Sequence, residues 1–169
     1  MELKGTKTEK NLWTAFAGES QARNKYTFYA SKARKDGYVQ IAKIFEETAA
    51  NEKEHAELWF KALHGDAIPG TADNLLDAAE GENYEWTDMY AQMAKDAKEE
   101  GNEKVAKYFG FACSVEEVHA NLYKKAIEDA QAFKGDYYIC PVCGYTHEGP
   151  MTGSCPVCGA KGANFIKVD

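Results

Sequence analysis

The chain has 169 residues, of which 44% are hydrophobic, and a formal net charge of −7 with its lysines and arginines scattered. This length allows one large domain or a medium domain with a small appendage, and the scattered basic residues exclude the charge pattern of a nucleic-acid-binding protein. No apolar run approaches the roughly 20 residues that a membrane helix needs. The N-terminus also lacks the apolar stretch of a signal peptide. We therefore expect a cytoplasmic protein with no nucleic-acid or membrane partner.

Four long helices are predicted before the composition of the chain changes. Thr6 and Glu9 form a capping box, which predicts the start of the first helix. A short helix over residues 71–79 is expected to end before Gly81, so the connection between the second and third long helices is expected to cross a bundle. The four long helices are predicted to cover residues 7–36, 38–63, about 82–100 and about 102–133.

The composition changes abruptly after the fourth helix. From residue 136 onward there are four cysteines and no helical period. A segment this short cannot bury enough surface to fold alone and usually needs a metal or disulfides. We therefore predict two domains, residues 1–134 and residues 135–169.

The pattern Glu-x-x-His occurs twice, and a lone glutamate precedes each copy at nearly the same distance along the chain. Residues three apart on a helix share a face, so each pair can bind one metal centre. Four glutamates and two histidines from four helices are what a di-iron or di-manganese carboxylate bundle requires. The predicted ligands are Glu19, Glu52, His55, Glu82, Glu116 and His119.

Further residues fall on or beside the same helix faces. Glu85 lies three residues after Glu82 and is a further candidate ligand. Tyr26 and Tyr90 lie on the same helix faces as the ligands. Each is either a core residue whose hydroxyl is hydrogen-bonded or a residue that contacts the ligands. Glu54 and Glu117 lie beside the ligands in the sequence, but successive residues of a helix are rotated by about 100°. We therefore predict that both side chains face solvent.

Four of the five cysteines form two Cys-Pro-Val-Cys-Gly knuckles, separated by eleven residues. Two such knuckles predict a tetrahedral thiolate site that suits iron or zinc, and a structural zinc ribbon is the alternative to an iron site. Tight Cys-x-x-Cys pairs also favour metal binding in a reducing compartment over a disulfide framework. The fifth cysteine, Cys113, is predicted to be a small buried apolar residue. The predicted thiolate ligands are Cys140, Cys143, Cys155 and Cys158.

With these motifs placed, the chain resembles the rubrerythrin family from end to end. The resemblance rests on Ala17-Gly-Glu-Ser-Gln-Ala-Arg23, on Glu82-x-x-Glu85, on both Glu-x-x-His pairs and on both knuckles. It implies an all-α ferritin-like four-helix bundle followed by a small rubredoxin-like, metal-bound β/loop domain. It also implies two iron ions in a carboxylate site and one iron ion held by four cysteines.

The resemblance implies a role for each ligand. Glu52 and Glu116 would bridge both irons. The remaining ligands would be divided between the irons: Glu19 with either His55 or Glu85 on one, and Glu82 with His119 on the other. Tyr26 and Tyr90 match tyrosines that contact the ligands in the family.

The implied activity is reduction of hydrogen peroxide to water, with electrons relayed from NAD(P)H through a reductase or a rubredoxin. A fourth helix of about 30 residues is ~45 Å long, so the cysteine domain is expected to lie far from the carboxylate site of its own chain. A head-to-tail homodimer would bring one subunit's cysteine domain to the other's carboxylates. The alternatives are a ferroxidase or iron-storage bundle with a structural zinc ribbon, and a plain electron carrier.

Overall fold

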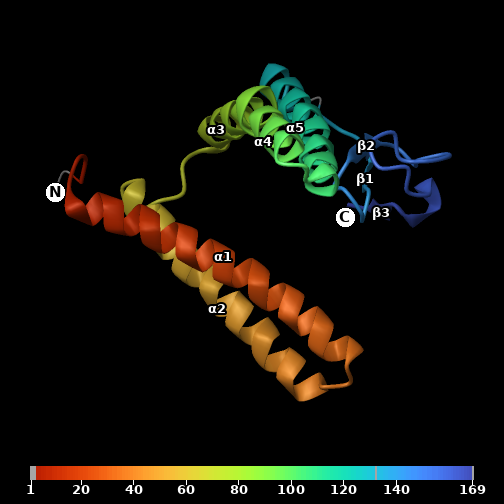
Figure 1. Cartoon of the computed structure of the whole chain (residues 1–169). Coiled ribbons are helices and arrows are strands. Elements are labelled where there is room, and N and C mark those ends of the chain that lie inside the picture. Colours follow the sequence, from red (N-terminus) through yellow and green to blue (C-terminus); the bar gives the residue numbers. More distant parts are fainter. Residues whose placement is uncertain (1–2, 132, 169) are drawn as a thin grey trace. The chain divides into compact units, whose positions relative to one another are not determined.

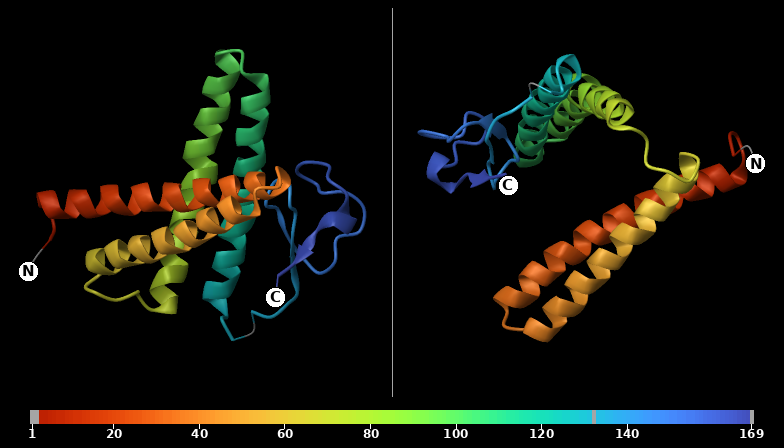
Figure 2. Two further views of the ribbon diagram at one scale, coloured as in Figure 1. Left: turned by 90° about the horizontal axis from the view of Figure 1, so that it is seen from below. Right: turned by 180° about the vertical axis from the view of Figure 1, so that it is seen from behind.

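A computed structural model describes residues 3–131 and 133–168 and divides the chain into two compact units, residues 1–69 and 70–169. The first unit is a hairpin of two antiparallel helices, and the second contains another helical hairpin and a small sheet (Figure 1; two further views in Figure 2). The helices are α1 (Lys7–Lys35), α2 (Val39–Leu63), α3 (Thr71–Tyr84), the π-helical turn η1 (Glu85–Met89), α4 (Tyr90–Glu99) and α5 (Glu103–Glu128).

The predicted capping box at the start of α1 is present. The Thr6 hydroxyl accepts a hydrogen bond from the Glu9 N–H at 3.1 Å. The Glu9 carboxylate in turn accepts from the N–H of Gly5 at 2.6 Å, one residue before the cap. These bonds satisfy backbone donors that a helix start leaves free, so the first helix begins where the sequence predicts.

Both hairpins turn at a glycine in the left-handed region, and the two glycines are separated by the same offset as the two Glu-x-x-His motifs. Gly37 follows α1 with a φ of 85°, and Gly101 follows α4 with a φ of 78°. In each case the next residue's N–H bonds to a carbonyl five residues back, at 2.8 and 2.7 Å. This is the Schellman arrangement, in which glycine avoids the strain that a Cβ would cause. The repeat seen in the ligands therefore extends to the turns.

Two helix predictions were wrong. The helix that begins at Thr71 does not end before Gly81 but continues through it, and η1 and α4 prolong the same path to Glu99. A glycine inside a helix costs only about 1 kcal/mol, which the packing of α3 on α5 can offset. The connection between the hairpins is therefore short, residues 64–70. The last helix ends at Glu128, five residues before the predicted end.

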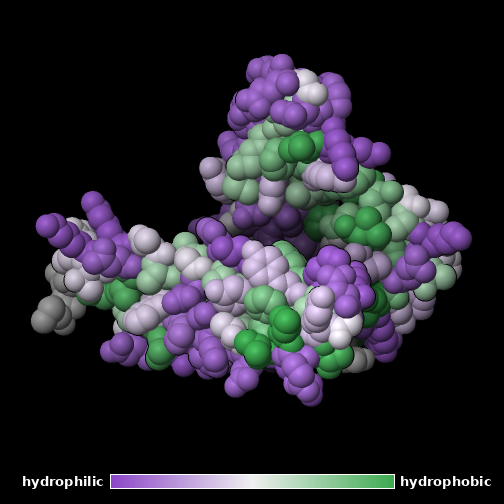
Figure 3. Space-filling view, turned by 60° about the horizontal axis from the view of Figure 1, so that its bottom comes forward, coloured by the Kyte–Doolittle hydropathy of each residue, from purple (hydrophilic) through white to green (hydrophobic). Residues whose placement is uncertain are grey.

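Alanine dominates the buried positions of both hairpins, since small side chains let two helices approach closely. A hairpin of two helices buries one stripe, and larger apolar side chains such as Phe28, Ile44 and Leu58 are exposed among charged ones. Figure 3 shows this mixture of apolar and charged surface. The buried alanines are Ala30, Ala33, Ala42, Ala49, Ala56, Ala79, Ala97, Ala120 and Ala126.

The C-terminal segment forms a three-stranded antiparallel sheet in the order β2-β1-β3. The strands β1 (Tyr137–Ile139), β2 (Thr146–Glu148) and β3 (Ile166–Lys167) are short, and a 3-10 turn, η2 (Gly162–Asn164), precedes β3. The largest fully buried side chain is a cysteine, Cys140, so this sheet has very little apolar core. Within the described residues, no helix has the length and apolar character needed to cross a membrane.

Candidate metal centres

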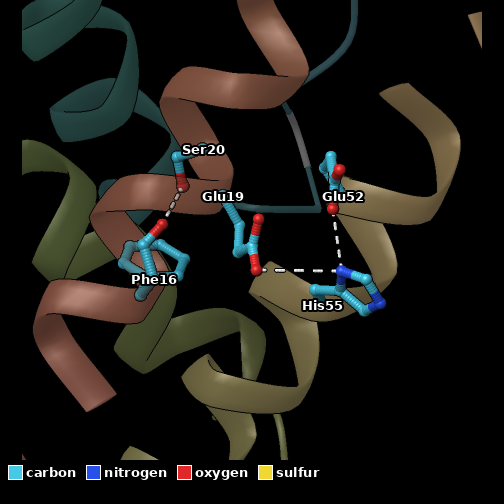
Figure 4. A network of polar contacts seen from close by, with 5 residues as sticks. All are labelled: Phe16, Glu19, Ser20, Glu52 and His55. Carbon is cyan, nitrogen blue, oxygen red and sulfur yellow. Dashed lines mark hydrogen bonds and ion pairs between the residues drawn. The ribbon is translucent and has the colours of Figure 1, made fainter. Parts of the chain in front are cut away.

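The first hairpin brings together Glu19 from α1 with Glu52 and His55 from α2. His55 Nδ1 lies 2.8 Å from Glu52 Oε2 and 3.8 Å from Glu19 Oε1. Figure 4 shows both carboxylates directed at this one nitrogen. One donor atom from each residue lies within 4.8 Å of the others, close enough for a single ion. We call these three residues the first half-site.

The second hairpin repeats this geometry with Glu82 from α3 and with Glu116 and His119 from α5. His119 Nδ1 lies 2.8 Å from Glu116 Oε2 and 3.7 Å from Glu82 Oε1. Their donor atoms also lie within 4.8 Å of one another. We call these three residues the second half-site. The structure thus brings the six predicted ligands together as two matching sets of three, one in each unit.

The tyrosines beside the half-sites repeat as well. Tyr26 packs on Phe45 and Tyr90 packs on Phe109, each pair with ring centroids 6.1 Å apart. Burial raises the pKa of Tyr90, and nearby carboxylates, Glu85 foremost, raise it further. Tyr90 therefore lies close to the acidic cluster of the second half-site.

One residue breaks the repeat, and the structure shows where. The spacing from Glu19 to Tyr26 is seven residues, whereas that from Glu82 to Tyr90 is eight. Between Glu82 and Tyr90 lies η1, a π-helical turn that begins at Glu85. A π turn accommodates an additional residue within a helix and is frequent at functional sites. The sequence shows the extra residue, but the spacing alone did not reveal that a π turn absorbs it.

The charges of the second half-site fit a bound cation. Burial raises the pKa of Glu82, and the neighbouring Glu116 carboxylate raises it further. Burial also raises the pKa of Glu85, with the charge of Glu82 adding to it. The Glu82 Oε2 atom is buried and has no hydrogen-bond partner among the described residues. Clustered carboxylates with an unpaired buried oxygen are unfavourable without a cation, and oxygen-rich sets with one imidazole suit iron.

The neighbouring glutamates lie where the helical spacing predicts. Glu54 and Glu117 are both exposed, while Glu52 and Glu116 beside them are half-buried. The helix rotation of about 100° per residue accounts for this separation.

The four cysteines of the C-terminal segment converge in a second kind of site. The Cys140 and Cys158 sulfurs lie 3.6 Å apart, as do those of Cys143 and Cys155. Each knuckle closes with an N–H of a left-handed glycine bonded to the first cysteine's carbonyl, at 3.0 and 2.9 Å. Four sulfurs at such spacing fit a tetrahedral metal ion.

The four-cysteine site already favours one thiolate. Burial opposes ionisation of Cys140, but the N–H groups of Cys143 and Val142 point at its sulfur and, together with the neighbouring thiols, lower its pKa to about 7. Burial raises the pKa of Cys143 and of Cys158. A metal ion would supply the positive charge that ionises these remaining thiols.

The cysteine domain lies beside the second half-site of its own chain. The Thr146 hydroxyl on β2 is 3.4 Å from His119 Nε2, and Lys125 on α5 donates to the Glu148 carboxylate at 2.9 Å. Glu116 and Cys143 line the same cavity of about 460 Å³. The expectation that the cysteine domain lies far from the carboxylates of its chain was therefore wrong for the second half-site, because β2 packs back along α5.

Thr146 and the partner of Cys113 were not predicted from sequence. A lone threonine in a β-strand carries no pattern that would indicate contact with a histidine 27 residues away. Cys113 was predicted to be a buried apolar residue, but its S–H donates to the Trp86 carbonyl at 3.2 Å and its side chain is half-buried. His64 and His147 bond to backbone carbonyls near the turns, as residues without a ligand pattern would.

Two matching carboxylate–histidine sets on paired helices, together with a four-cysteine sheet domain, define a di-metal carboxylate protein with a rubredoxin-like appendage. Comparison with family models agrees with this class. The model of the Rubrerythrin family matches residues 10–127, and the model "Rubrerythrin, rubredoxin-like domain" matches residues 138–166. The chain belongs to the rubrerythrin family, and the predicted fold class is confirmed.

Individual relatives span nearly the whole chain. Rubrerythrin-1 of Clostridium acetobutylicum is 46% identical and aligns with 92% of this chain and 91% of its own length. The rubrerythrin of Nitratidesulfovibrio vulgaris is 42% identical, with 96% and 95% coverage. A solved structure of nigerythrin in a partially reduced state has a TM-score of 0.58 at 37% identity, covering 96% of this chain and 87% of that one.

Membership also confirms the predicted cofactor classes. Rubrerythrins are di-iron proteins with peroxidase activity, and this chain carries both the glutamate and histidine ligands of a di-iron carboxylate site and the four cysteines of a rubredoxin-like site. The protein is therefore an oxidoreductase of the di-iron type.

Proposed function

We propose that the two half-sites complete one di-iron centre that reduces hydrogen peroxide to water, and that the four-cysteine iron supplies its electrons. The observation that carries this proposal is the pair of matching Glu, Glu and His sets, with a thiolate site beside one of them. A lone acidic cluster would suit many roles, whereas this combination joins a two-metal site to a one-electron carrier.

With two ferrous ions bound, the site would have available the two electrons that cleavage of the peroxide O–O bond consumes. The chain's own residues would hold the pair as the family resemblance implies, with Glu52 and Glu116 shared between the irons. Each of the two half-sites adds one further glutamate and one histidine. Carboxylate oxygens stabilise the ferric products.

The reaction also consumes two protons per peroxide. Glu85 is placed to carry one of them, because its half-buried carboxyl group lies close enough to Glu82 and His119 for their charges to act on it. When Glu85 is not a ligand, its carboxyl can hold a proton beside the reacting oxygens. We propose that Glu85 and His55 would serve as alternative ligands of one iron, as the family resemblance implies.

We propose further that NAD(P)H feeds the four-cysteine iron through a separate reductase or a rubredoxin, in a reducing cytoplasmic compartment that keeps the thiols free for metal. The head-to-tail homodimer stays a prediction. One reason for it, the distance between the cysteine domain and the carboxylates of the same chain, does not hold for the second half-site.

The first prediction tests the function directly. After anaerobic reduction of the iron-loaded protein, stoichiometric hydrogen peroxide is expected to reoxidise the thiolate iron, restoring its visible absorption within seconds. The physical reason is that an oxidised pair held by the half-sites would accept an electron from an iron held by the four cysteines. Stopped-flow absorbance measures this. A zinc-filled cysteine site with peroxide-independent iron uptake would instead support the ferroxidase alternative and contradict the proposal.

The two irons are expected to be inequivalent. Glu85 has Ala22 as its counterpart in the first hairpin, so one metal has an additional carboxylate available. Glu85→Ala is expected to lower peroxidase turnover by at least about 10- to 100-fold, the loss that follows removal of an outer partner of a metal ligand. Asp88→Ala is the matched control, since Asp88 lies in the same π turn but is exposed. Full turnover in Glu85→Ala, with both irons retained after oxidation, would refute the ligand exchange.

A further inference from the structure

The π turn η1 changes the hydrogen-bond partners of backbone carbonyls, that of Trp86 among them. In an α-helix the N–H of residue 90 would bond to the carbonyl of residue 86, four residues back. Here the Tyr90 N–H bonds instead to the carbonyl of Glu85, five residues back. The Trp86 carbonyl therefore loses that donor. A carbonyl that loses a donor in the packed region between two helices is more stable when another group donates to it.

The thiol of Cys113 on α5 supplies a replacement donor. Its S–H donates to the Trp86 carbonyl oxygen at 3.2 Å, across the α5–η1 interface. Burial raises the pKa of this thiol, and the charges of Glu117 and Glu116 raise it further, so that the sulfur keeps the proton that it donates.

The first hairpin provides an internal comparison. By the offset that relates the two Glu-x-x-His motifs, the counterpart of Cys113 is Ala49, which is buried on α2. The helix facing it, α1, is α-helical throughout Lys7–Lys35 and contains no π turn. The hairpin with the π turn thus has a side-chain donor at this position, and the hairpin without it has a methyl group.

We propose that Cys113 is a positioning residue that stabilises the π turn and thereby holds Glu85 toward the second half-site. The turn begins at Glu85, so any return to α-helical pairing would rotate the residues on one side of it relative to Glu82. Cys113 acts through the backbone of Trp86 and touches neither substrate nor metal. The proposed consequence for catalysis rests on the role of Glu85 given above, whereas the contact itself does not.

Infrared spectroscopy of the metal-loaded protein tests the contact. When four of the chain's five cysteines bind metal, Cys113 carries the one remaining S–H group. Its S–H stretching band is identified as the one that is lost in Cys113→Ala. Because the S–H donates a hydrogen bond, the band is expected at a lower frequency than that of a thiol without a hydrogen bond. A band at the free-thiol frequency would overturn the proposal.

Amide hydrogen exchange tests the positioning. In Cys113→Ala, exchange of the Tyr90 amide is expected to speed up by about fivefold, the effect of losing one modest hydrogen bond, while the equivalent Tyr26 amide is unchanged. Cys113→Ser, which keeps a donor, is expected to stay within twofold of the parent. Equally faster exchange of the Tyr90 amide in both variants would mean that Cys113 contributes packing alone. Unchanged exchange in both would mean that Cys113 does not stabilise the π turn. Either result would overturn the proposal. Neither measurement depends on peroxidase activity, so a failure of the proposed function would be seen separately.

Discussion

Glu116→Ala is expected to abolish both tight iron binding at the di-iron centre and peroxidase turnover. We expect activity to fall more than about 100-fold, which exceeds the loss caused by removing an outer partner of a ligand. Glu116 holds His119 at 2.8 Å and is proposed to bridge both irons. Its removal would therefore weaken two metals at once. Elemental analysis of iron per chain and steady-state peroxide consumption measure the two effects.

Glu117→Ala is the matched control for this prediction. Glu117 is the next residue of α5, with the same charge, but it is exposed and the helix turns it away from the half-site. We expect iron content and turnover within about twofold of the parent, as for most surface substitutions. Equal losses in the two variants would indicate a general charge effect and contradict the assignment of Glu116 as a ligand.

Removing the metal from the four-cysteine site is expected to unfold residues 137–167 while leaving the helices intact. The strands are two or three residues long, and the fully buried side chains of this segment are chiefly the cysteines Cys140 and Cys155. Binding of a structural ion to such thiolates contributes about 10–16 kcal/mol in small zinc domains, far more than this sheet's apolar core can supply. Cys158→Ser, which removes one thiolate, should have a similar but smaller effect.

Two measurements separate the domain from the helices. Amide NMR signals of residues 137–167 should collapse to random-coil positions, whereas far-ultraviolet circular dichroism should retain most of the helical signal. Retained dispersion of the sheet signals without metal would contradict the prediction.

The metal affinity of this site should also depend on pH. In the folded arrangement Cys140 has a pKa lowered to about 7 from the ordinary 9. Its thiolate therefore favours this arrangement fully above pH 9, and the contribution, too small to keep the segment folded without metal, disappears as the pH falls through 7. Protons compete with metal for the same sulfurs, so affinity should weaken in the same direction.

The clusters of candidate ligands were predictable because metal ligation imposes a local spacing. Glu and His three residues apart share a helix face wherever the helix lies, and two cysteines flanking a two-residue turn converge in any knuckle. The turn glycines Gly37 and Gly101 are predictable for the same reason, since each depends on a backbone conformation that few other residues adopt.

Features that depend on packing could not be predicted in this way. Gly81 resembles a helix end in sequence, but the packing of α3 on α5 carries the helix through it. The eight-residue spacing from Glu82 to Tyr90 is visible in the sequence, yet it does not say whether a loop, a kink or a π turn absorbs the extra residue. Thr146 contacts His119 because the chain folds back along α5, and no local sequence pattern predicts this contact.

The sequence by itself determined the chemistry of this protein: which carboxylates, imidazoles and thiols form each set, and that the carboxylate–histidine set occurs twice in the chain. These depend on distances of a few residues, which helix and knuckle geometry convert directly into shared faces. The tertiary structure decided what lies beside those sets. The π turn with its Cys113 donor, and the cysteine domain placed against the second half-site, both come from contacts between segments distant in the chain. Such contacts depend on how whole helices and strands pack against one another, and the spacing of residues in the sequence does not predict that packing.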